Sequence, residues 1–473
     1  MTPIKLLSTS SILIASVLLS GCGSDNDNNA LPVYDTLDAY FITGLNYSDI
    51  VSADLDADGD MDLVQCGYDR ENQTSHTQIY LNNLGTFELL STPLDTNNDG
   101  EGDTSLYALE YECALDIADM DNDGDIDIVG TGAGPAPDYG VFTHVFENQG
   151  NNIFTTKTDW VRNSDETLSD LLGTNQGFVT FTDINNDQHL EIMLSASTDQ
   201  DNLSKLYLNN ADGTFSVINN PVDGTSVLLN KNNGTHAWGD FNGDKFQDLI
   251  ILGGQGDAST YLYLNNKNNT FSKVGNPVNG TAEFPGLYSG PVSWGDIDGD
   301  NDLDILISAR EGSGNNPHTL IYENLGSDNA FQFSLVATPI DTDGDNIGDS
   351  MFTEYSLSEM FLADIDGKNE LDIILIGEDM ANDTNATSIY LNTGDKSYIR
   401  LENPVDTDND GSGDAQFEAV YYAGATVADL DNDGDMDLIY NGQNNDFTLA
   451  LTLVYENIDG TTFVNVSESN QPL

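Results

Sequence analysis

The chain has 473 residues, 38% of them apolar and 9% aromatic, so it can bury a large core and is not expected to be disordered throughout. Its 80 acidic and 13 basic side chains give a formal net charge of −67 at pH 7. Binding to phosphate backbones needs clustered Lys and Arg, so this balance argues against a nucleic-acid partner. Such a charge repels itself unless cations neutralise it, and bound divalent ions are therefore expected. A solubility adaptation to a salty environment is a second explanation.

The N-terminus has the pattern of an export signal. Lys5 precedes an apolar stretch, residues 12–19, that is too short to span a bilayer permanently. The next residues, Leu19-Ser20-Gly21-Cys22, resemble the bacterial lipobox, in which the Cys is acylated; a plain signal peptide with a chance Cys is the alternative. The resemblance implies a signal peptide over residues 1–21 and a lipid on Cys22. It also implies an outer-membrane lipoprotein facing the periplasm or the cell surface, with residues 22–38 as acylated Cys and flexible tether.

Two landmarks recur along the mature chain. The first is the acidic pattern Asp-x-Asp/Asn-x-Asp-Gly-x-x-Asp followed by apolar residues, and the second is an aromatic residue, then Leu or Glu, then Asn. The acidic patterns, here called core loops, begin at Asp54, Asp119, Asp183, Asp240, Asp296, Asp364 and Asp429; the second landmark ends at Asn82, Asn148, Asn209, Asn265, Asn324, Asn392 and Asn457. Seven such units fill the chain and leave no room for a second domain.

Each repeat predicts about four short strands. One strand enters the core loop, one leaves it, and two flank a tight turn after the Asn. Four-stranded units repeated around an axis protect their edge strands, whereas a linear β-solenoid needs much shorter repeats. The predicted fold is therefore all-β, a seven-bladed β-propeller of four-stranded antiparallel blades over residues 39–473.

The spacing within the core loops suits one hard cation. Oxygens at positions 1, 3, 5 and 9 and a carbonyl at position 7 can surround Ca²⁺, and Gly at position 6 permits the turn. Lys245 and Gln188 stand at position 6 in two loops and weaken them, while Lys368 replaces a ligand in the sixth loop, which is predicted to hold no ion. The six predicted ligand sets are Asp54, Asp56, Asp58, Asp62; Asp119, Asp121, Asp123, Asp127; Asp183, Asn185, Asp187, Glu191; Asp240, Asn242, Asp244, Asp248; Asp296, Asp298, Asp300, Asp304; and Asp429, Asp431, Asp433, Asp437.

On these motifs the chain resembles the FG-GAP or VCBS repeat family, the calcium-loop propeller also found at the head of integrin α-chains. The resemblance covers nearly all of the mature chain and implies that each core loop joins the two inner strands of a blade. Three longer connections between repeats, here called insertion loops, have the same acidic spacing and resemble the calcium loops of thrombospondin type 3 repeats; a solvated acidic turn is the alternative. Their candidate ligands are Asp95, Asn97, Asp99, Asp103; Asp341, Asp343, Asp345, Asp349; and Asp406, Asp408, Asp410, Asp414.

The remaining chemistry is sparse. Cys66 and Cys113 are an even pair in a chain with an export signal, so a disulfide between them is predicted. No HExxH, GxSxG or phosphate-loop motif accompanies the five His. Trp238 and Trp294 are expected in the core between blades.

Two functions fit this sequence. The first is a non-catalytic, calcium-binding adhesion, ligand-binding or scaffold module for a surface protein or glycan, alone or as an accessory subunit. The second is a polysaccharide lyase or other carbohydrate-active enzyme, because some propellers that resemble this one are lyases; the scarcity of Lys and Arg counts against it. The binding surface is expected on the face opposite the core loops, where the variable between-blade connections end, with Trp160 and Arg162 as candidate contacts.

Overall fold

The computed structural model describes residues 42–467, apart from residues 84, 136–139, 164, 166, 198–201, 255, 281, 313–315, 345–346, 353–354, 380–383, 395, 409 and 445–446. The predicted signal peptide, Cys22 and the tether lie outside the described residues. Within the described part of the chain, no helix is both long and apolar enough to cross a membrane.

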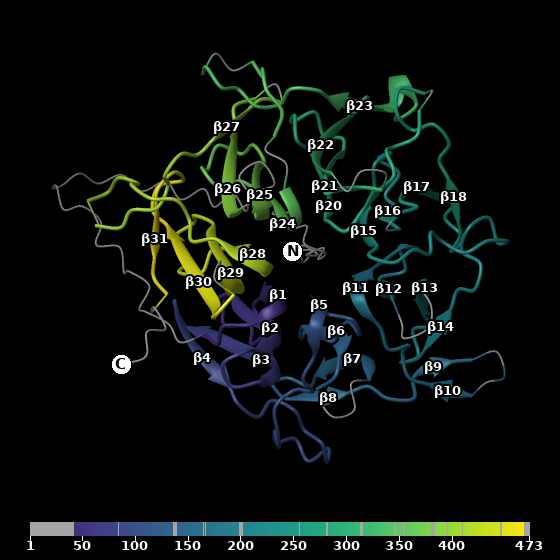
Figure 1. The fold of residues 1–473 in the computed structure, drawn as a ribbon. Coiled ribbons are helices and arrows are strands. Elements are labelled where there is room, and N and C mark those ends of the chain that lie inside the picture. The colour runs from purple at the N-terminus through teal and green to yellow at the C-terminus, as the bar shows by residue number, and fades with distance from the viewer. Residues whose placement is uncertain are drawn as a thin grey trace, which may run out of the picture.

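Seven β-sheets, the blades, are arranged around one axis, as predicted from the repeats (Figure 1). The first four blades are β1 (Asn46–Ala53), β2 (Asp62–Asp69), β3 (Thr74–Asn83), β4 (Thr86–Leu90); β5 (Glu110–Ala118), β6 (Asp127–Ala133), β7 (Val141–Asn148), β8 (Phe154–Thr156); β9 (Val161–Arg162), β10 (Leu168–Ser169), β11 (Asn175–Thr182), β12 (Glu191–Ser197), β13 (Asn202–Asn209), β14 (Phe215–Val217); and β15 (Thr235–Gly239), β16 (Asp248–Gly253), β17 (Ser259–Asn265), β18 (Phe271–Lys273). The last three are β19 (Leu287–Tyr288), β20 (Val292–Gly295), β21 (Asp304–Glu311), β22 (Pro317–Asn324), β23 (Phe333–Val336), with the short 3-10 helix η1 (Ser327–Asn329); β24 (Tyr355–Ala363), β25 (Asp372–Asp379), β26 (Thr384–Asn392), β27 (Tyr398–Arg400); and β28 (Val420–Ala428), β29 (Asp437–Asn444), β30 (Ala450–Asn457), β31 (Phe463–Asn465).

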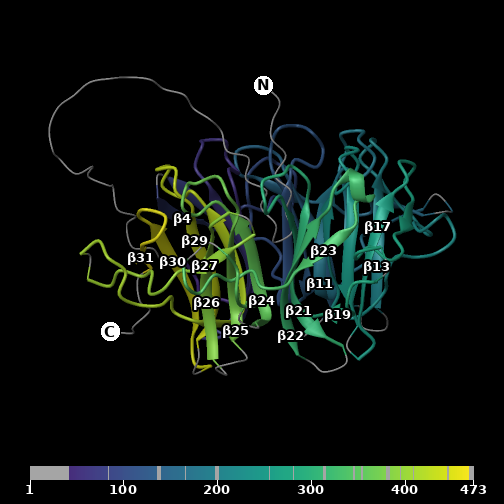
Figure 2. The same ribbon diagram turned by 90° about the horizontal axis from the view of Figure 1, so that it is seen from above.

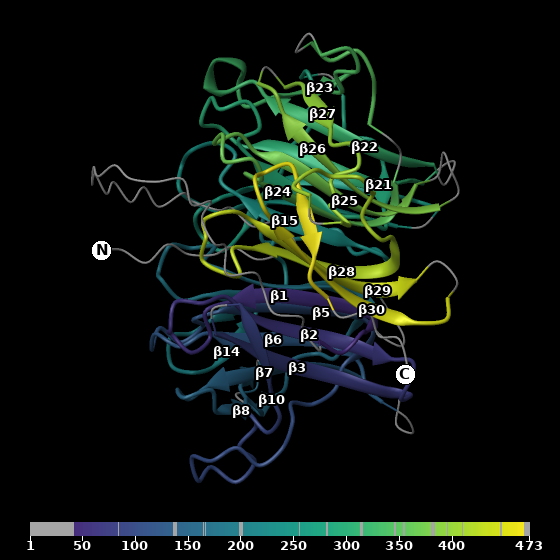
Figure 3. The same ribbon diagram turned by 90° about the vertical axis from the view of Figure 1, so that its left-hand side faces the viewer.

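Four strands of each blade pair antiparallel, and they run from one face of the ring to the other (Figures 2 and 3). In the third blade β9 and β10 are added beyond β14, with β9 parallel to it, and in the fifth blade β19 and β20 both pair with β21. The apolar core lies between blades. Ile374 and Ile389 of the sixth blade, for example, share one buried cluster with Val427 and Leu438 of the seventh. A single blade therefore cannot bury its own apolar faces, and stability depends on the completed ring.

The landmark Asn side chains bond neighbouring blades to each other. Nδ2 of Asn392 donates to the carbonyl of Ile297 in the preceding blade at 3.0 Å and to the carbonyl of Leu371 in its own blade at 3.2 Å, while its Oδ1 accepts from Gly394 N at 2.9 Å. Both N–H donors of this buried amide and its oxygen therefore have partners. The bond to the preceding blade is also made by Asn82, Asn148, Asn265, Asn324 and Asn457.

The ring closes through side chains. The first and seventh blades are each one continuous segment among the described residues, and neither borrows a strand from the other. Asn82 donates to the carbonyl of Leu430 in the seventh blade at 2.7 Å, so the closing contact repeats the one made by Asn148, Asn265, Asn324, Asn392 and Asn457. Buried polar pairs add to it: Ser48 donates to Asn441 at 2.6 Å, and the Ser52 and Thr426 hydroxyls lie 3.0 Å apart.

A disulfide joins Cys66 of β2 to Cys113 of β5 and so links the first two blades covalently. It closes a loop over a sequence separation of 47 residues. Such a loop restricts the unfolded chain and typically stabilises the folded state by about 3–4 kcal/mol.

Six between-blade connections share one anchoring contact. The outermost strand of the next blade begins with a buried aromatic residue whose N–H donates to a carbonyl of the connection. The donor and acceptor pairs are Phe154 and Pro93, Phe215 and Trp160, Phe271 and Pro221, Phe333 and Pro277, Tyr398 and Pro339, and Phe463 and Pro404.

This anchoring corrects the expected place of the insertion loops. Asp95 N donates to Phe154 O at 2.8 Å, and Phe154 pairs with Asn148, whose N–H binds the core-loop residue Asp127. The insertion loops therefore start at the outer rim near the core loops, and not on the opposite face.

The expected exposure of Trp160 is also wrong, whereas the contact role suggested for Arg162 stays a prediction. Trp160 is only 4% exposed and packs edge-on against Phe215, with ring centroids 4.8 Å apart. Arg162 lies in β9, which pairs parallel with β14, and its guanidinium bonds Asp212 at 2.8 Å. The connection adds the β9–β10 hairpin to the edge of the third blade, because an edge strand with free backbone groups is satisfied by another strand. Trp160 is thus a core residue.

We predict that Asn392→Asp lowers the free energy of unfolding by about 3–5 kcal/mol, because a carboxylate loses two donated hydrogen bonds and faces two carbonyl oxygens in a buried site. Chemical denaturation measures the loss. Asn268→Asp is the matched control, since exposed Asn268 only accepts hydrogen bonds from Thr270 through Oδ1. Equal stability of the two variants would contradict the role of Asn392.

Candidate metal centres in the acidic loops

Each core loop links the innermost strands of one blade and has one internal hydrogen-bond pattern. Oδ2 of the position-1 Asp accepts from the position-6 N–H in all seven loops, and Oδ1 at position 3 accepts from the position-5 N–H. The position-6 donors are Gly59, Gly124, Gln188, Lys245, Asn301, Asn369 and Gly434. The position-5 donors are Asp58, Asp123, Asp187, Asp244, Asp300, Lys368 and Asp433.

Position 6 needs a left-handed backbone whatever its side chain. Gly59, Gly124 and Gly434 adopt φ near 100°, and the non-glycine residues there are also positive, with φ of 72° at Gln188 and 76° at Lys245. These two residues carry the steric cost that Gly avoids. The turn is therefore kept in the loops that depart from the pattern.

The oxygens that remain are placed as ligands for a cation. Oδ1 of Asp54 and Oδ1 of Asp296 are buried and have no hydrogen-bond partner, which is costly for a carboxylate unless a cation binds it. In several loops three carboxylates each bring one oxygen within 4.8 Å of the others, among them Asp54, Asp56 and Asp58, and Asp119, Asp121 and Asp127. The donor set is all oxygen, as Ca²⁺ prefers, so these residues fit the ion that the sequence predicts.

Position 9 has a structural bond as well as a ligand geometry. Asp62 accepts from Leu55 N at 2.8 Å and from Asn82 N at 2.7 Å, so it joins the core loop to the landmark Asn. Burial raises the pKa of Asp62 to about 7 and that of Asp437 to about 8. A bound cation would favour the ionised form of these buried carboxyls. Asp127, Asp304, Asp372 and Asp437 make the same pair of bonds.

The third loop uses a longer side chain at position 9. Glu191 accepts from Ile184 N at 3.0 Å through Oε2, and burial raises its pKa to about 8. The third loop therefore keeps the internal hydrogen bonds of the others with Asn185 at position 3 and Glu at position 9.

Three consecutive core loops have a lysine ammonium at a candidate ligand. Lys368 Nζ lies 2.5 Å from Asp366 Oδ2 in the sixth loop, where Asp364, Asp366 and Asp372 still bring one oxygen each within 4.8 Å of the others, so the absence of an ion there stays a prediction. Lys396 Nζ lies 3.1 Å from Asp298 in the fifth loop. Lys267 Nζ lies 3.1 Å from Asp244 in the fourth. The sequence analysis found only Lys368, because Lys267 and Lys396 lie outside the acidic pattern, on turns after landmark Asn residues.

The insertion loops also gather acidic side chains. Asp341, Asp343 and Asp349 each bring an oxygen within 4.8 Å of the others, while Asp345 lies outside the described residues. The position-2 Thr hydroxyl binds the position-9 carboxylate, as Thr342 does to Asp349 at 2.8 Å. Thr96 with Asp103 and Thr407 with Asp414 repeat this contact.

The histidine with a serine partner is a packing residue. His236 is fully buried, 2.9 Å from Thr180 Oγ1 and 2.5 Å from Ser195 Oγ, and burial lowers its pKa to about 3. A substrate cannot reach this pair. Trp238 and Trp294 are 6% and 4% exposed, and the prediction that they belong to the core between blades is confirmed.

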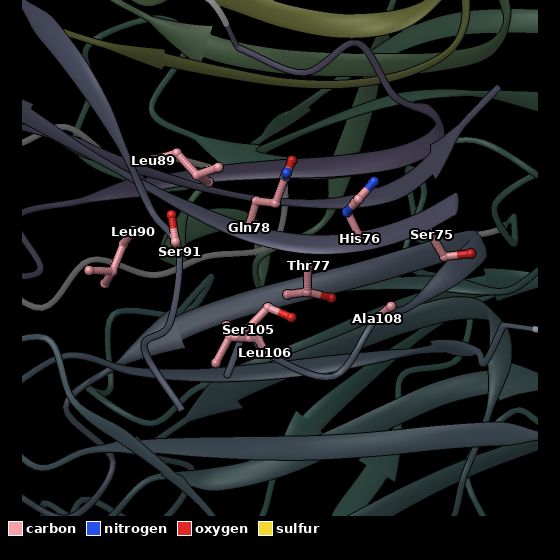
Figure 4. A pocket seen from close by; sticks show the side chains of 10 residues that line it. All are labelled: Ser75, His76, Thr77, Gln78, Leu89, Leu90, Ser91, Ser105, Leu106 and Ala108. Carbon is pink, nitrogen blue, oxygen red and sulfur yellow. The ribbon is translucent and has the colours of Figure 1, made fainter. Parts of the chain in front are cut away.

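A cavity of about 130 Å³ lies between the first blade and the connection that leads to the second (Figure 4). Residues 75–78 of β3, residues 89–91 and the connection around Leu106 line it. Sites for small organic ligands usually measure about 300–1,000 Å³, so this gap is too small for a typical cofactor.

The model of the FG-GAP-like repeat matches residues 183–251 and 240–307. Each match begins at position 1 of a core loop and ends in the strand that leaves the next one, β16 or β21. The fold and its loops define a seven-bladed β-propeller with acidic loops between the inner strands. The chain is a propeller with FG-GAP-like repeats, and both predictions, of fold and of repeat type, are confirmed.

Solved structures resemble the chain only distantly. An Agrocybe aegerita lectin, described for its specific recognition of non-reducing terminal N-acetylglucosamine, is 18% identical with a TM-score of 0.36, over 90% of this chain and 81% of the lectin. A putative exo-β-1,3-galactanase from Bifidobacterium bifidum s17 is 10% identical with a TM-score of 0.32, over 68% and 98%. An exo-β-1,3-galactanase from Phanerochaete chrysosporium, with galactose, is 10% identical with a TM-score of 0.33, over 78% and 79%. These scores carry no argument about function, and a comparison with curated proteins finds no match.

We predict that Lys368→Asp increases the number of Ca²⁺ ions bound by one, because it restores an oxygen at position 5 and removes the ammonium beside Asp366. Equilibrium dialysis with metal analysis gives the count. Lys368→Gln is the control: it removes the charge without adding a carboxylate and is expected to bind much more weakly. An unchanged count for Lys368→Asp would contradict this account of the sixth loop.

Proposed function

We propose that this protein is a calcium-stabilised, non-catalytic binding or scaffold module, held at the outer membrane by a lipid on Cys22. The observation that carries the calcium part is the shared loop geometry, in which position-1 carboxylates bind one backbone N–H and, in Asp54 and Asp296, leave a buried oxygen without a hydrogen-bond partner. When bound, Ca²⁺ supplies positive charge to these oxygens and bridges residues at several loop positions.

The electrostatics of the whole chain support the same role. A formal charge of −67 opposes the compact ring, and the core loops concentrate that charge beside the inner strands. In the fourth, fifth and sixth blades a lysine relieves part of it. The first, second, third and seventh core loops have no such lysine contact among the described residues, so their occupancy is expected to matter most for stability. The fifth loop keeps the partnerless Oδ1 of Asp296 beside the Lys396 contact and is expected to bind a cation more weakly.

A binding role is favoured over catalysis by the placement of the reactive side chains. The one His that bonds a Ser among the described residues is inaccessible. The carboxylate clusters lie in the core loops, where their oxygens accept hydrogen bonds from the loop backbone. Because the same arrangement recurs in every blade, it indicates a structural role. A rigid ring with unlike connections is a general way to present specific contacts on a constant scaffold.

We predict that removal of calcium lowers the melting temperature by many degrees. Sites with dissociation constants of about 0.1–1 mM each contribute roughly 1–3 kcal/mol at about 10 mM calcium. Calorimetry in excess EDTA, after verified metal removal, measures the change. Asp56→Asn should reproduce part of the loss, whereas Asp366→Asn, beside Lys368, should not alter the calcium response. An unchanged melt in EDTA would refute the calcium role.

The non-catalytic part is tested with a depolymerisation assay on neutral and acidic polysaccharides, alongside pull-down and glycan-array screens with and without calcium. The proposal expects calcium-dependent binding and no new chain ends. Release of unsaturated or reducing ends by the wild-type protein would establish the carbohydrate-active alternative instead.

A further inference from the structure

An aromatic surface cluster crosses the seam between the first and seventh blades. It consists of Tyr47 on β1, Tyr421 and Tyr422 on β28, and Phe447 in the turn between β29 and β30. The ring centroids of Tyr47 and Tyr422 lie 4.4 Å apart, those of Tyr421 and Tyr422 4.1 Å, and those of Tyr421 and Phe447 5.4 Å. Phe447 is 48% exposed, and the three tyrosines are partly exposed. We call these four residues the seam aromatics.

The seam aromatics lie on the face opposite the core loops. β1 ends at Ala53 and β28 at Ala428, each directly before a core loop, whereas Tyr47 and Tyr422 lie near the other ends of these strands. The eight or nine residues of each strand separate the two ends by roughly 25 Å. A ligand on the seam aromatics therefore does not touch the candidate calcium ligands.

Two of these tyrosines have a costly backbone. Tyr47 and Tyr422 have φ of 51° and 54°, and both fall in bulges, where the strand register shifts between Asn46 and Asp49 and between Tyr421 and Gly424. A left-handed backbone is unfavourable for a bulky residue and costs about 1–3 kcal/mol. Gly would adopt it freely. The same backbone recurs seven positions before the core-loop Asp in two other blades, at Asn233 and Ser289 with φ of 50° and 52°, so it belongs to the repeat. In the first and seventh blades this position carries a tyrosine, and the two rings meet at one seam.

The spacing of the rings distinguishes between classes of ligand. A cation-binding cage needs ring faces separated by the width of an ammonium group. Centroids 4.1–5.4 Å apart mean that neighbouring seam aromatics contact one another, two pairs edge-to-face at 73° and 75° and one pair tilted by 32°. They form one packed aromatic surface that leaves no gap for an ammonium group between the rings. Such a surface accommodates the apolar face of a sugar ring, and the tyrosine hydroxyls can hydrogen-bond its hydroxyl groups.

The exposed area of the seam aromatics and the net charge of the chain limit the classes of ligand further. Three partly buried tyrosines and the half-exposed Phe447 offer on the order of 200 Å², about a quarter of the roughly 800 Å² that each partner contributes to a stable protein interface. The net charge of −67 repels acidic polysaccharides. A neutral glycan of one to three sugar rings meets both limits.

We propose that the seam aromatics bind a neutral glycan by stacking its pyranose rings on Tyr422 and its neighbours. This deepens the proposed binding function and rests on it. Tyr47 and Tyr422 then use a left-handed position of the repeat to present two rings across the joint at which the propeller closes.

The test compares the wild type with Tyr422→Gly by isothermal titration calorimetry against neutral hexose oligosaccharides, identified on an array. Tyr422→Gly should weaken binding at least tenfold without lowering the melting temperature, because it removes a ring and relieves the left-handed strain. A purely structural Tyr422 would give a lower melting temperature instead. Tyr107→Ala is the control, since Tyr107 is 47% exposed in another aromatic cluster, with His144, and should keep full binding.

Three outcomes would overturn the proposal: no neutral oligosaccharide binds the wild type, Tyr422→Gly binds as well as the wild type, or tetramethylammonium or uronic-acid oligosaccharides bind in preference. Failure here is distinct from failure of the proposed function. If a protein ligand binds the wild type and Tyr422→Gly equally, the glycan site is rejected but the proposed binding module is kept. If the protein depolymerises polysaccharides, the proposed non-catalytic function is rejected.

Discussion

The fold depends on one repeated contact, the amide of the landmark Asn between two carbonyl oxygens of adjacent blades. Asn392 shows the complete set: its Nδ2 bonds the preceding blade and its own loop, its Oδ1 bonds the turn that follows, and its main-chain N–H binds Asp372. A buried amide whose donors and oxygen all have partners fixes the relative position of two sheets as well as stabilising them. Since Asn82 makes the same bond to Leu430, the contact also completes the ring.

The same contact couples the ionisation of the core loops to the packing between blades. Asp62 and its counterparts bind both the loop backbone and the landmark Asn, so a change in the ionisation of the loop acts directly on the joint between blades. Burial already disfavours the ionised form of these carboxyls, as the pKa of about 8 for Asp127 shows. A cation bound by the neighbouring oxygens would counter that penalty, and a lysine such as Lys396 does so in part.

The fold and the candidate metal loops could be predicted from the sequence, because both depend on short residue patterns that recur with a nearly constant period. The acidic spacing identified the core loops, and the Asn landmark identified the blade period. The role of the Asn could not be predicted, since its partner lies in another blade: Asn148 and Leu55 are 93 positions apart. The misplacement of Trp160 has a similar cause. Trp160 lies in a variable, polar connection, which indicated an exposed position. In the structure β9 pairs with the edge strand β14, and this pairing buries the Trp160 ring. The tyrosines at the seam gave no signal in the sequence, because bulges and left-handed backbones depend on the register of paired strands.

The central claim is that cations occupy core loops whose oxygens converge, and that lysine takes their place elsewhere. A crystal structure of the protein grown in calcium, with anomalous diffraction data, tests it most directly. The account predicts anomalous peaks beside Oδ1 of Asp54 and in the loops that begin at Asp119 and Asp429, and none between Lys368 and Asp366. Loops without any peak in saturating calcium, or a peak at Lys368 with none at Asp54, would contradict it.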